Sequence, residues 1–484
     1  MIVWELEKLI RDYTMQEEFK IAGYWRPAAW DSDREIRGFV EYSPRDGINL
    51  VLEGTFEEPL QPGKPLVLRA DAFVHYEVIH GRALDNDTPI TLFEAIGPPI
   101  PNFGNVSQRY RCQWCIVGEH VRCLAEWKHT SVWVRHYNLE EFIGSNPFSL
   151  GSPEPRERRL TATFVEPLAM KGLLGKYEVQ TAHEANLSTE PMFTRVELTH
   201  AAWLRISAPI AMGADFLRGP LHMIGCLLDL AAGQHLPIIA LHGLRGAQRS
   251  QIFFNQKRAH FLPKRLQAIG GHPIGFAFTL RHLASKLTAS LSAWYWAMTF
   301  HAASFNLYFT LDPEQDADVA TDFHFISYAT ALEAYHEVAH RTCQRCEAIR
   351  QQRSGWRQSV LLTIGSSAEK SISDWVSGVL GAASQPSLKT RYYELFDEQP
   401  ECVRKLLGQR EAFVEFVYNC RNLLAHGGRP YDGPEELIKL WRATRKLRLL
   451  MQSIMLQQLA LPAPLFLGML QNLSDYRYLN TFPG

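Results

Sequence analysis

Residues 418–428 read YNCRNLLAHGG, and this stretch decides the fold expected for the carboxy-terminal part of the chain. Apolar side chains recur at helical intervals from Phe413 to Leu424, which predicts the end of an amphipathic helix. The glycine pair at positions 427 and 428 supplies the left-handed residue that commonly ends a helix. The pattern therefore places an arginine, an asparagine and a histidine in the last turns of one helix.

Three polar residues of this stretch, Arg421, Asn422 and His426, have the chemistry needed to cut RNA. Asn422 and His426 are one turn apart, whereas Arg421 and His426 lie about 140° apart around an ideal helix. A guanidinium binds phosphate through paired hydrogen bonds, and an imidazole titrates near neutral pH. Together they can activate a ribose 2′-hydroxyl and stabilise the charge on the phosphate without a metal. The alternative is that Arg421 and His426 only interact with the helix dipole.

The spacing of these residues near a helix end resembles the signature of the HEPN superfamily of RNases. The resemblance implies that Arg421, Asn422 and His426 are catalytic and face a cleft between two protomers. It implies that His426 transfers protons, that Arg421 binds the phosphate, and that Asn422 orients one of them. The products implied are a 2′,3′-cyclic phosphate and a 5′-hydroxyl, with no metal or other cofactor.

Length and composition indicate a folded protein of several domains. A chain of 484 residues suggests about three domains, and 46% hydrophobic with 21% charged residues is typical of globular proteins. The net charge of −1 provides no overall attraction to nucleic acid, so RNA must bind local patches. No signal peptide is expected, and eight scattered cysteines favour reduced thiols in a cytoplasm. Residues 287–311 carry no charge, yet their polar and aromatic content favours buried strands or a core helix over a membrane span.

The order of the predicted elements indicates an α+β multidomain protein with a β-rich, sandwich-like amino-terminal half and a carboxy-terminal helical bundle. Short β-branched and aromatic runs broken by Gly, Pro and Asp predict hairpins. The clearest runs are 19–27, 38–43, 47–54, 91–96, 131–134, 177–180, 194–198 and 203–206, with a helix at 216–232. Turn-forming residues between 144 and 155 suggest a boundary. We therefore expect a β-rich domain at 1–155, a second β-rich region with helices at 156–315, and a helical domain at 316–484.

Helical periodicity dominates the last of these regions. It predicts helices at 323–352, 360–383, 401–426 and 434–459, and Pro434 is a good first helical residue. Four to five helices with the arginine–histidine pattern before the last long one suit a bundle. They also match the HEPN pattern.

A narrower resemblance covers most of the chain. Residues 23–27 (GYWRP), Gly38 and residues 47–54 resemble the start of the amino-terminal domain of ApeA-type anti-phage proteins, and residues 325–334 (FISYATALEA) resemble the first helix of their HEPN domain. The resemblance implies abortive-infection defence by cleavage of host RNA, with tRNA as the first candidate substrate. It further implies a homodimer or higher oligomer, restraint through the amino-terminal half, and a phage-encoded protein as a possible trigger. The alternative is a non-catalytic HEPN-like module that binds RNA or protein.

Two other groups of residues have metal-binding spacing. His336 and His340 form an H-E-x-x-H pattern on a predicted helix, which suits a zinc protease, a structural metal site that includes Cys343, or simply a polar helix face. Cys112 and Cys115 form a C-x2-C pattern that suits zinc, buried thiols or a redox pair. We expect no metal at either place, and a zinc protease is the less favoured alternative.

Charged residues around the predicted site also allow two interpretations. Glu333 lies in an apolar turn, so it either orients Arg421 across the bundle or is exposed. A stripe of Lys439, Arg442 and Lys446 either attracts RNA or is a solvated face. Residues 230–311 contain no Asp or Glu but many cations and aromatics, which suits an RNA groove or a surface that answers acids elsewhere in the chain.

Overall fold

The protein is described here by a computed structural model in which two units can be distinguished. The described residues are 13–30, 34–56, 73–98, 107–144, 148–150, 162–164, 169–189, 196–213, 219–246, 248–255, 275–311, 321–340, 344–364 and 386–482. A sheet-based unit comprises residues 1–228, 236–274 and 279–288, and a helical unit comprises residues 229–235, 275–278 and 289–484. The predicted division into three regions at 155/156 and 315/316 stays a prediction.

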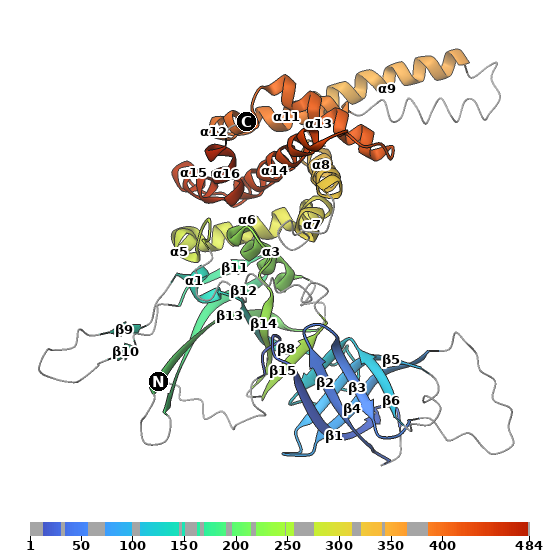
Figure 1. Ribbon diagram of the computed structural model, residues 1–484, viewed down its shortest axis with the longest axis vertical. Helices are drawn as coiled ribbons and strands as arrows, with labels where there is room; N and C mark the ends of the chain where they lie inside the picture. The colour runs from blue at the N-terminus through green and yellow to red at the C-terminus, as the bar shows by residue number, and fades with distance from the viewer. Residues whose placement is uncertain are drawn as a thin grey trace, which may run out of the picture. The chain divides into compact units, whose positions relative to one another are not determined.

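Antiparallel strands form the sheet-based unit (Figure 1). They are β1 (Phe19–Pro27), β2 (Ile36–Ser43), β3 (Gly47–Leu52), β4 (Val74–Ala83), β5 (Pro89–Gly97), β6 (Gln108–Cys112), β7 (Trp114–Val117), β8 (His129–His136), β9 (Phe148–Leu150), β10 (Ala162–Phe164), β11 (Lys171–Leu174), β12 (Tyr177–Thr189), β13 (Val196–Met212), β14 (Ile238–Arg245) and β15 (Gln248–Phe254). The small helices of this unit are α1 (Leu139–Ile143), α5 (Leu280–Leu283) and η3 (Ala284–Lys286), and α3 (Pro220–Ala232) spans the division between the units.

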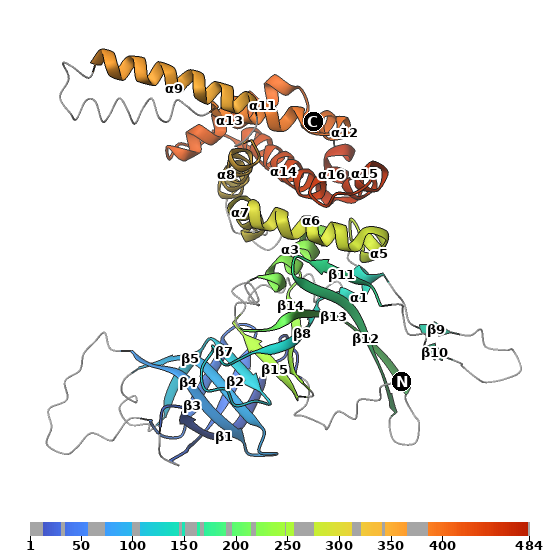
Figure 2. The same ribbon diagram turned by 180° about the vertical axis from the view of Figure 1, so that it is seen from behind.

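Thirteen of these strands make one continuous sheet in the order β11-β12-β13-β8-β14-β15-β7-β5-β4-β1-β2-β3-β6. The sheet closes on itself because β5 pairs with β6 at Ile96 and Arg111, in addition to its pairing with β4 and β7. Beyond this closed part, β12 and β13 form a long hairpin that continues the sheet (Figure 2). The prediction of a β-rich amino-terminal half is confirmed. The predicted separate strands at 194–198 and 203–206 are wrong, because residues 196–212 form the single strand β13.

The inward face of the closed sheet explains the GYWRP stretch. Residues of β1 alternate between buried and exposed, and Trp25 is fully buried. Trp25 lies opposite Gly81 of β4, where a Cβ atom would stand 2.2 Å from the indole ring. Gly81 therefore provides the space that the ring of Trp25 fills.

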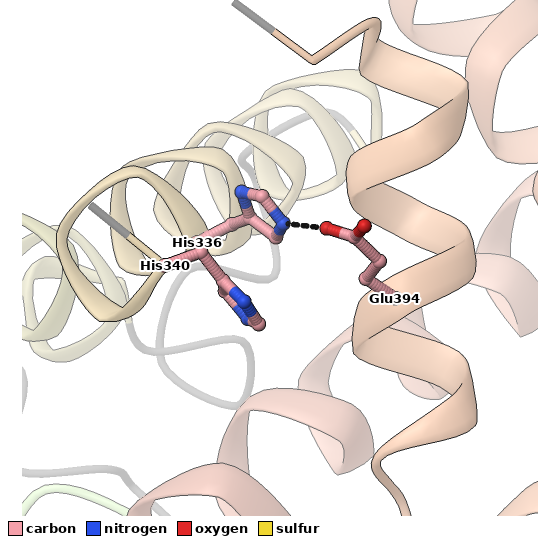
Figure 3. A group of neighbouring side chains, drawn as sticks. All are labelled: His336, His340 and Glu394. Atoms are coloured by element: carbon pink, nitrogen blue, oxygen red, sulfur yellow. Dashed lines mark hydrogen bonds and ion pairs between the residues drawn. The ribbon is translucent and has the colours of Figure 1, made fainter. Parts of the chain in front are cut away.

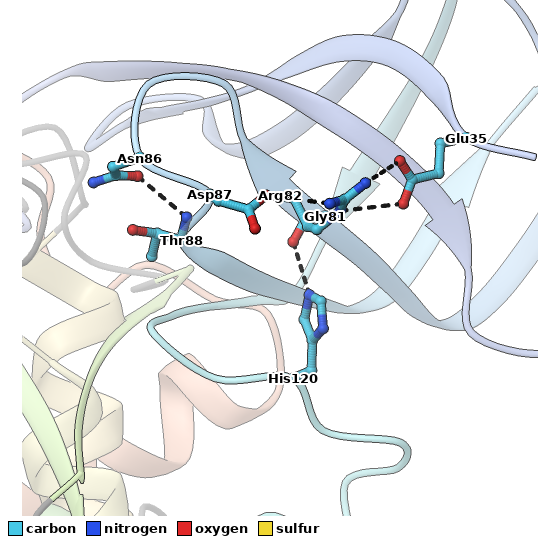
Figure 4. A network of polar contacts seen from close by, with 7 residues as sticks. All are labelled: Glu35, Gly81, Arg82, Asn86, Asp87, Thr88 and His120. Carbon is cyan, nitrogen blue, oxygen red and sulfur yellow. Dashed lines mark hydrogen bonds and ion pairs between the residues drawn. The ribbon is translucent and has the colours of Figure 1, made fainter. Parts of the chain in front are cut away.

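Polar contacts surround Gly81 and the turn that joins β4 to β5 (Figure 4). Nε2 of His120 lies 2.8 Å from the carbonyl oxygen of Gly81. The next residue, Arg82, donates to Glu35 at 2.8 Å and to Asp87 at 3.2 Å. Because the Arg82 ion pairs are solvent-exposed, they contribute little to stability, and the packing of Trp25 dominates here.

Replacement of Gly81 by alanine should therefore destabilise the sheet-based unit by about 1–3 kcal/mol, since the new methyl group overlaps a ring that has no room to move. Urea denaturation followed by tryptophan fluorescence measures this loss. Gly225→Ala is the matched control. Gly225 lies in α3, and its Cβ would make an ordinary contact of 3.6 Å with the ring of His136. Equal denaturation midpoints for Gly81→Ala and the wild type would refute this account of the packing.

Helices form the second unit. They are α6 (Leu287–Phe300), α7 (Ala302–Thr310), α8 (Thr321–Ala339), α9 (Gln344–Ile364), α11 (Leu388–Asp397), α12 (Glu401–Leu407), α13 (Arg410–Ala425), α14 (Pro434–Gln457), α15 (Ala463–Asn472) and α16 (Ser474–Thr481). Residues 287–311 are thus helical rather than stranded. No helix in the described part of the chain is both long and apolar enough to cross a membrane.

The structure corrects several predicted helix boundaries. The single helix expected at 401–426 is two helices, because the chain turns at Gly408 with φ at +95°. The helix expected at 323–352 is divided between α8 and α9, and most of the helix expected at 360–383 lies outside the described residues. The helix expected at 434–459 is confirmed as α14, with Pro434 at its start. Helices α15 and α16 extend the bundle beyond the predicted elements.

A buried ion-pair network joins two of these helices. Asp475 of α16 is fully buried and lies 2.9 Å from Nη1 of Arg445 and 3.2 Å from Nη1 of Arg448, both on α14. Arg448 also donates to the carbonyl oxygen of Gly233. Since Arg448 is itself buried, Asp475 is the carboxylate that compensates its charge.

Candidate active site

The structure places Arg421 against a carboxylate from another helix of the bundle. Its Nε donates to Oε1 of Glu333 at 2.8 Å, and its Nη2 donates to Oε2 at 2.9 Å. The hydroxyl of Tyr392 on α11 donates to Glu333 Oε1 at 3.1 Å. Of the two interpretations of Glu333, the one in which it orients Arg421 is confirmed.

This arrangement leaves part of the guanidinium available to a ligand. Arginine has five N–H donors, and Glu333 engages the edge formed by Nε and Nη2. Both donors of Nη1 and the second donor of Nη2 remain for a phosphate. The hydrogen bonds that Arg421 donates to Glu333 raise the pKa of Arg421, and burial raises the pKa of Tyr392, so the guanidinium stays charged and the phenol stays neutral. The Arg421 side chain is 27% exposed, so it can be reached from solvent.

The other two predicted residues lie at the end of the same helix. His426 is the first residue beyond α13 and is exposed, while Asn422 is half-buried. The backbone N–H of His426 donates to the carbonyl oxygen of Asn422 at 3.2 Å, and Gly427 follows with φ at +76°. The predicted helix end is confirmed. Among the described residues, the side chain of His426 has no hydrogen bond or ion pair, so one protomer does not by itself join His426 to Arg421.

Exposed apolar side chains are present on the segments that carry this site. Leu423 on α13 is 44% exposed, and Ile438 near the start of α14 is 52% exposed. Leu437 beside it is 39% exposed. A contiguous patch of exposed apolar side chains is typical of a surface that another protein covers.

The basic stripe of α14 does not form one RNA-facing surface. Lys446 donates to the carbonyl oxygen of Leu407 at 2.9 Å, and burial lowers its pKa. It therefore satisfies the end of α12, where the helix leaves carbonyl groups without partners. Lys439 is exposed and Arg442 is half-buried.

The H-E-x-x-H residues form a second polar cluster in the helical unit (Figure 3). His336 Nε2 donates to Oε2 of Glu394 on α11 at 2.7 Å, and the rings of His336 and His340 stack with centroids 4.1 Å apart. Nε2 of His340 lies 3.1 Å from Glu398. Burial lowers the pKa of His336, and the bond with Glu394 opposes this shift. Cys343, the other residue considered for this cluster, lies outside the described residues.

The C-x2-C pair has no metal-ligand environment in the described part of the chain. Cys112 and Cys115 are fully buried on β6 and β7, and burial raises the pKa of Cys112 to about 12 and that of Cys115 further. The only group of His, Cys, Asp and Glu side chains close enough to hold an ion among the described residues is the one at His336. The thiols are therefore protonated core residues, as in the buried-thiol interpretation.

Two cations of the acid-free stretch, Arg245 and Arg249, have partners within the sheet-based unit. Arg245 contacts Glu119 at 3.3 Å, and Nε of Arg249 donates to His242 at 2.7 Å. The cations between residues 256 and 274 lie outside the described residues. The same unit has a pocket of about 890 Å³. Its lining includes Glu94, Arg109, Arg111, Trp114 and Phe254.

Comparison with known families identifies both units. Residues 326–465 match the Apea-like HEPN family, so the helical unit is an HEPN domain, a class whose members are generally ribonucleases. Residues 20–294, more than half of the chain, match ApeA N-terminal domain 1. The chain therefore belongs to the ApeA family of anti-phage HEPN proteins, and both predicted resemblances are confirmed. No curated protein and no solved structure matches the chain.

Proposed function

We propose that this protein is an endoribonuclease that cuts host RNA at Arg421, Asn422 and His426 without a catalytic metal. The observation that carries the proposal is the pair of hydrogen bonds from Arg421 to Glu333. These two bonds fix the guanidinium near the end of α13, and its other edge can bind a phosphate. A guanidinium held in advance stabilises charge that develops on the phosphate at no cost of reorganisation.

His426 then acts as the proton-transfer group. It takes the proton from a ribose 2′-hydroxyl, the 2′-oxygen attacks the adjacent phosphorus, and the bond from phosphorus to the 5′-oxygen breaks. The proton returns to the leaving 5′-oxygen, which gives a 2′,3′-cyclic phosphate and a 5′-hydroxyl. Asn422, one turn before His426, orients either His426 or Arg421.

Two protomers complete the site in this proposal. His426 has no side-chain partner among the described residues, and the exposed Leu423 and Ile438 provide apolar surface for a second copy. A two-fold dimer presents both copies of the motif to one RNA. Transfer RNA is the first candidate substrate, because the resemblance to the family points to structured cellular RNA.

The same proposal includes regulation: the sheet-based unit restrains the nuclease until a phage-encoded protein binds. Its pocket includes arginine and aromatic side chains, which are enriched where proteins recognise one another. Cleavage of host RNA after such a signal stops growth and limits the phage.

The proposal is tested with purified full-length protein and total tRNA in buffer without Mg²⁺. Wild type should release fragments with a 2′,3′-cyclic phosphate and a 5′-hydroxyl. His426→Ala should cut about 10²–10⁴-fold more slowly, since a general base is lost. Unchanged RNA binding by a folded His426→Ala protein would show that the slower cleavage arises in the chemical step. If the wild type binds RNA but leaves it whole in the presence of infected-cell extract, the non-catalytic module is the correct class.

Glu333→Gln should lower kcat about 10²-fold with a smaller change in KM. Glutamine lacks the charge that holds Arg421, and an error of about 1 Å in a catalytic group costs roughly this much. Single-turnover rates at saturating tRNA measure the effect. Glu415→Gln is the matched control, because Glu415 contacts Lys389 at the surface of α13. Equal loss in both variants would show that Glu333 does not position Arg421.

A further inference from the structure

The cluster of His336, His340 and Glu394 has the composition and spacing of a metal site. His336 lies in the last turn of α8 and His340 directly follows that helix, four residues later, and their rings stack with centroids 4.1 Å apart and an interplanar angle of 16°. Glu394 faces them from α11 (Figure 3). One ligand atom from each of the three residues lies within 4.8 Å of the other two. Within the described residues, no other group of potential ligands meets this condition.

We propose that His336, His340 and Glu394 bind a zinc ion that joins α8 to α11. Two imidazoles and one carboxylate are ligands that zinc prefers, with bonds of about 2.0–2.2 Å. Tetrahedral ligands at that distance stand about 3.3 Å apart. The present contact of 2.7 Å between His336 and Glu394 is a hydrogen bond, which the ion replaces when these two atoms separate slightly.

The surroundings of the cluster favour a cation. Glu398 lies 3.1 Å from Nε2 of His340, in the kind of contact by which a carboxylate orients a metal-binding imidazole. Among the described residues, Arg391 is a cation near His336, and two carboxylates, Glu394 and Glu398, contact the two histidines. An ion here therefore meets two carboxylates.

The site is structural rather than proteolytic. His336 is only 2% exposed between the two helices, and a water molecule fills the fourth position that three protein ligands leave on the ion. Glu337, the residue that would be the base of a zinc protease, is exposed on α8. The ion joins two helices and performs no reaction.

The position of the ion links it to Arg421. Glu333 precedes His336 by three residues on α8, and Tyr392 precedes Glu394 by two residues on α11. Glu333 and Tyr392 are bonded to each other, and Glu333 holds Arg421. An ion that fixes α8 against α11 thus keeps this cluster in place. This second step, unlike zinc binding itself, rests on the proposed ribonuclease function.

The test begins with the metal content of the full-length protein, purified without a histidine tag. About one zinc per chain is expected, and zinc returned after dialysis against a chelator should raise Tm by about 5 °C, whereas Mg²⁺ should not. His340→Gln and Glu394→Gln should lose both the zinc and the shift while keeping the helical circular dichroism of the wild type. His75→Ala is the matched control, because His75 and Glu94 make a similar 2.8 Å contact without a third ligand.

The outcomes separate zinc binding from the nuclease. Wild-type protein without bound zinc and without a zinc-dependent Tm overturns the metal site and leaves a hydrogen-bonded contact between the helices. Zinc that survives in both variants also overturns it. If zinc binds as expected but tRNA incubated with the wild type stays whole, the metal site stands and the proposed ribonuclease function is contradicted.

Discussion

Replacement of Arg421 by alanine should lower the rate of RNA cleavage by about 10³-fold, because in the proposed reaction the guanidinium stabilises phosphate charge in the transition state. The structure gives this residue a single defined position, bonded to Glu333 at 2.8 and 2.9 Å. Arg421→Lys should also be slow, since an ammonium cannot make two parallel bonds to Glu333 and bind a phosphate with its other edge. Single-turnover cleavage of tRNA by folded, dimeric protein measures both variants.

Arg429→Ala is the matched control for this substitution. Arg429 is exposed and lies three residues beyond His426. Its removal therefore takes away the same charge near the site without disturbing the hydrogen bonds between Arg421 and Glu333. It should lower cleavage only slightly through weaker attraction of RNA. If Arg429→Ala and Arg421→Ala lose the same activity, Arg421 acts through general charge and has no role of its own in the reaction.

Asp475→Asn should destabilise the helical unit by about 3–5 kcal/mol, although the substitution barely changes the size of the side chain. The carboxylate is fully buried between Arg445 and Arg448. Asparagine leaves the buried charge of Arg448 uncompensated, and the cost of an unpaired buried charge exceeds the value of the ion pair itself. Guanidinium denaturation of the full chain, followed by the helical signal, measures the loss.

Glu401→Gln is the control for this second substitution. Glu401 pairs with Lys405 one turn along α12, and both side chains are more than 70% exposed. Loss of that exposed pair should leave the stability almost unchanged. A similar small change for Asp475→Asn would contradict the account of the buried network.

The sequence was most informative where periodicity and end signals agree. Strand β1, helix α14 and the end of α13 follow from alternation, from Pro434 at a first turn and from Gly427 after the last turn. These are local effects, and they are visible in one stretch of sequence. The break at Gly408 was missed because the apolar pattern continues on both sides of it.

The remaining features depend on residues that are distant in sequence. Closure of the sheet depends on the pairing of β5 with β6, which no local pattern indicates. The sequence alone left open whether Glu333 orients Arg421 or is exposed, because its neighbours are apolar. Only the folded bundle brings Glu333 to Arg421, which lies 88 residues later. Glu394 was missed as a partner of His336 because no helix was predicted at residues 388–397 and 58 residues separate the two. A carboxylate on the buried side of α11 would have been the available signal.

The most direct measurement follows growth and tRNA integrity in cells that express the wild type, Arg421→Ala or His426→Ala, with and without phage infection. The wild type should cut tRNA and arrest growth in at least one of the two conditions. Both variants should leave tRNA whole and lose protection, while accumulating as folded protein. Intact tRNA in all three cultures, together with equal protection from phage, would contradict the assignment of the nuclease to the end of α13.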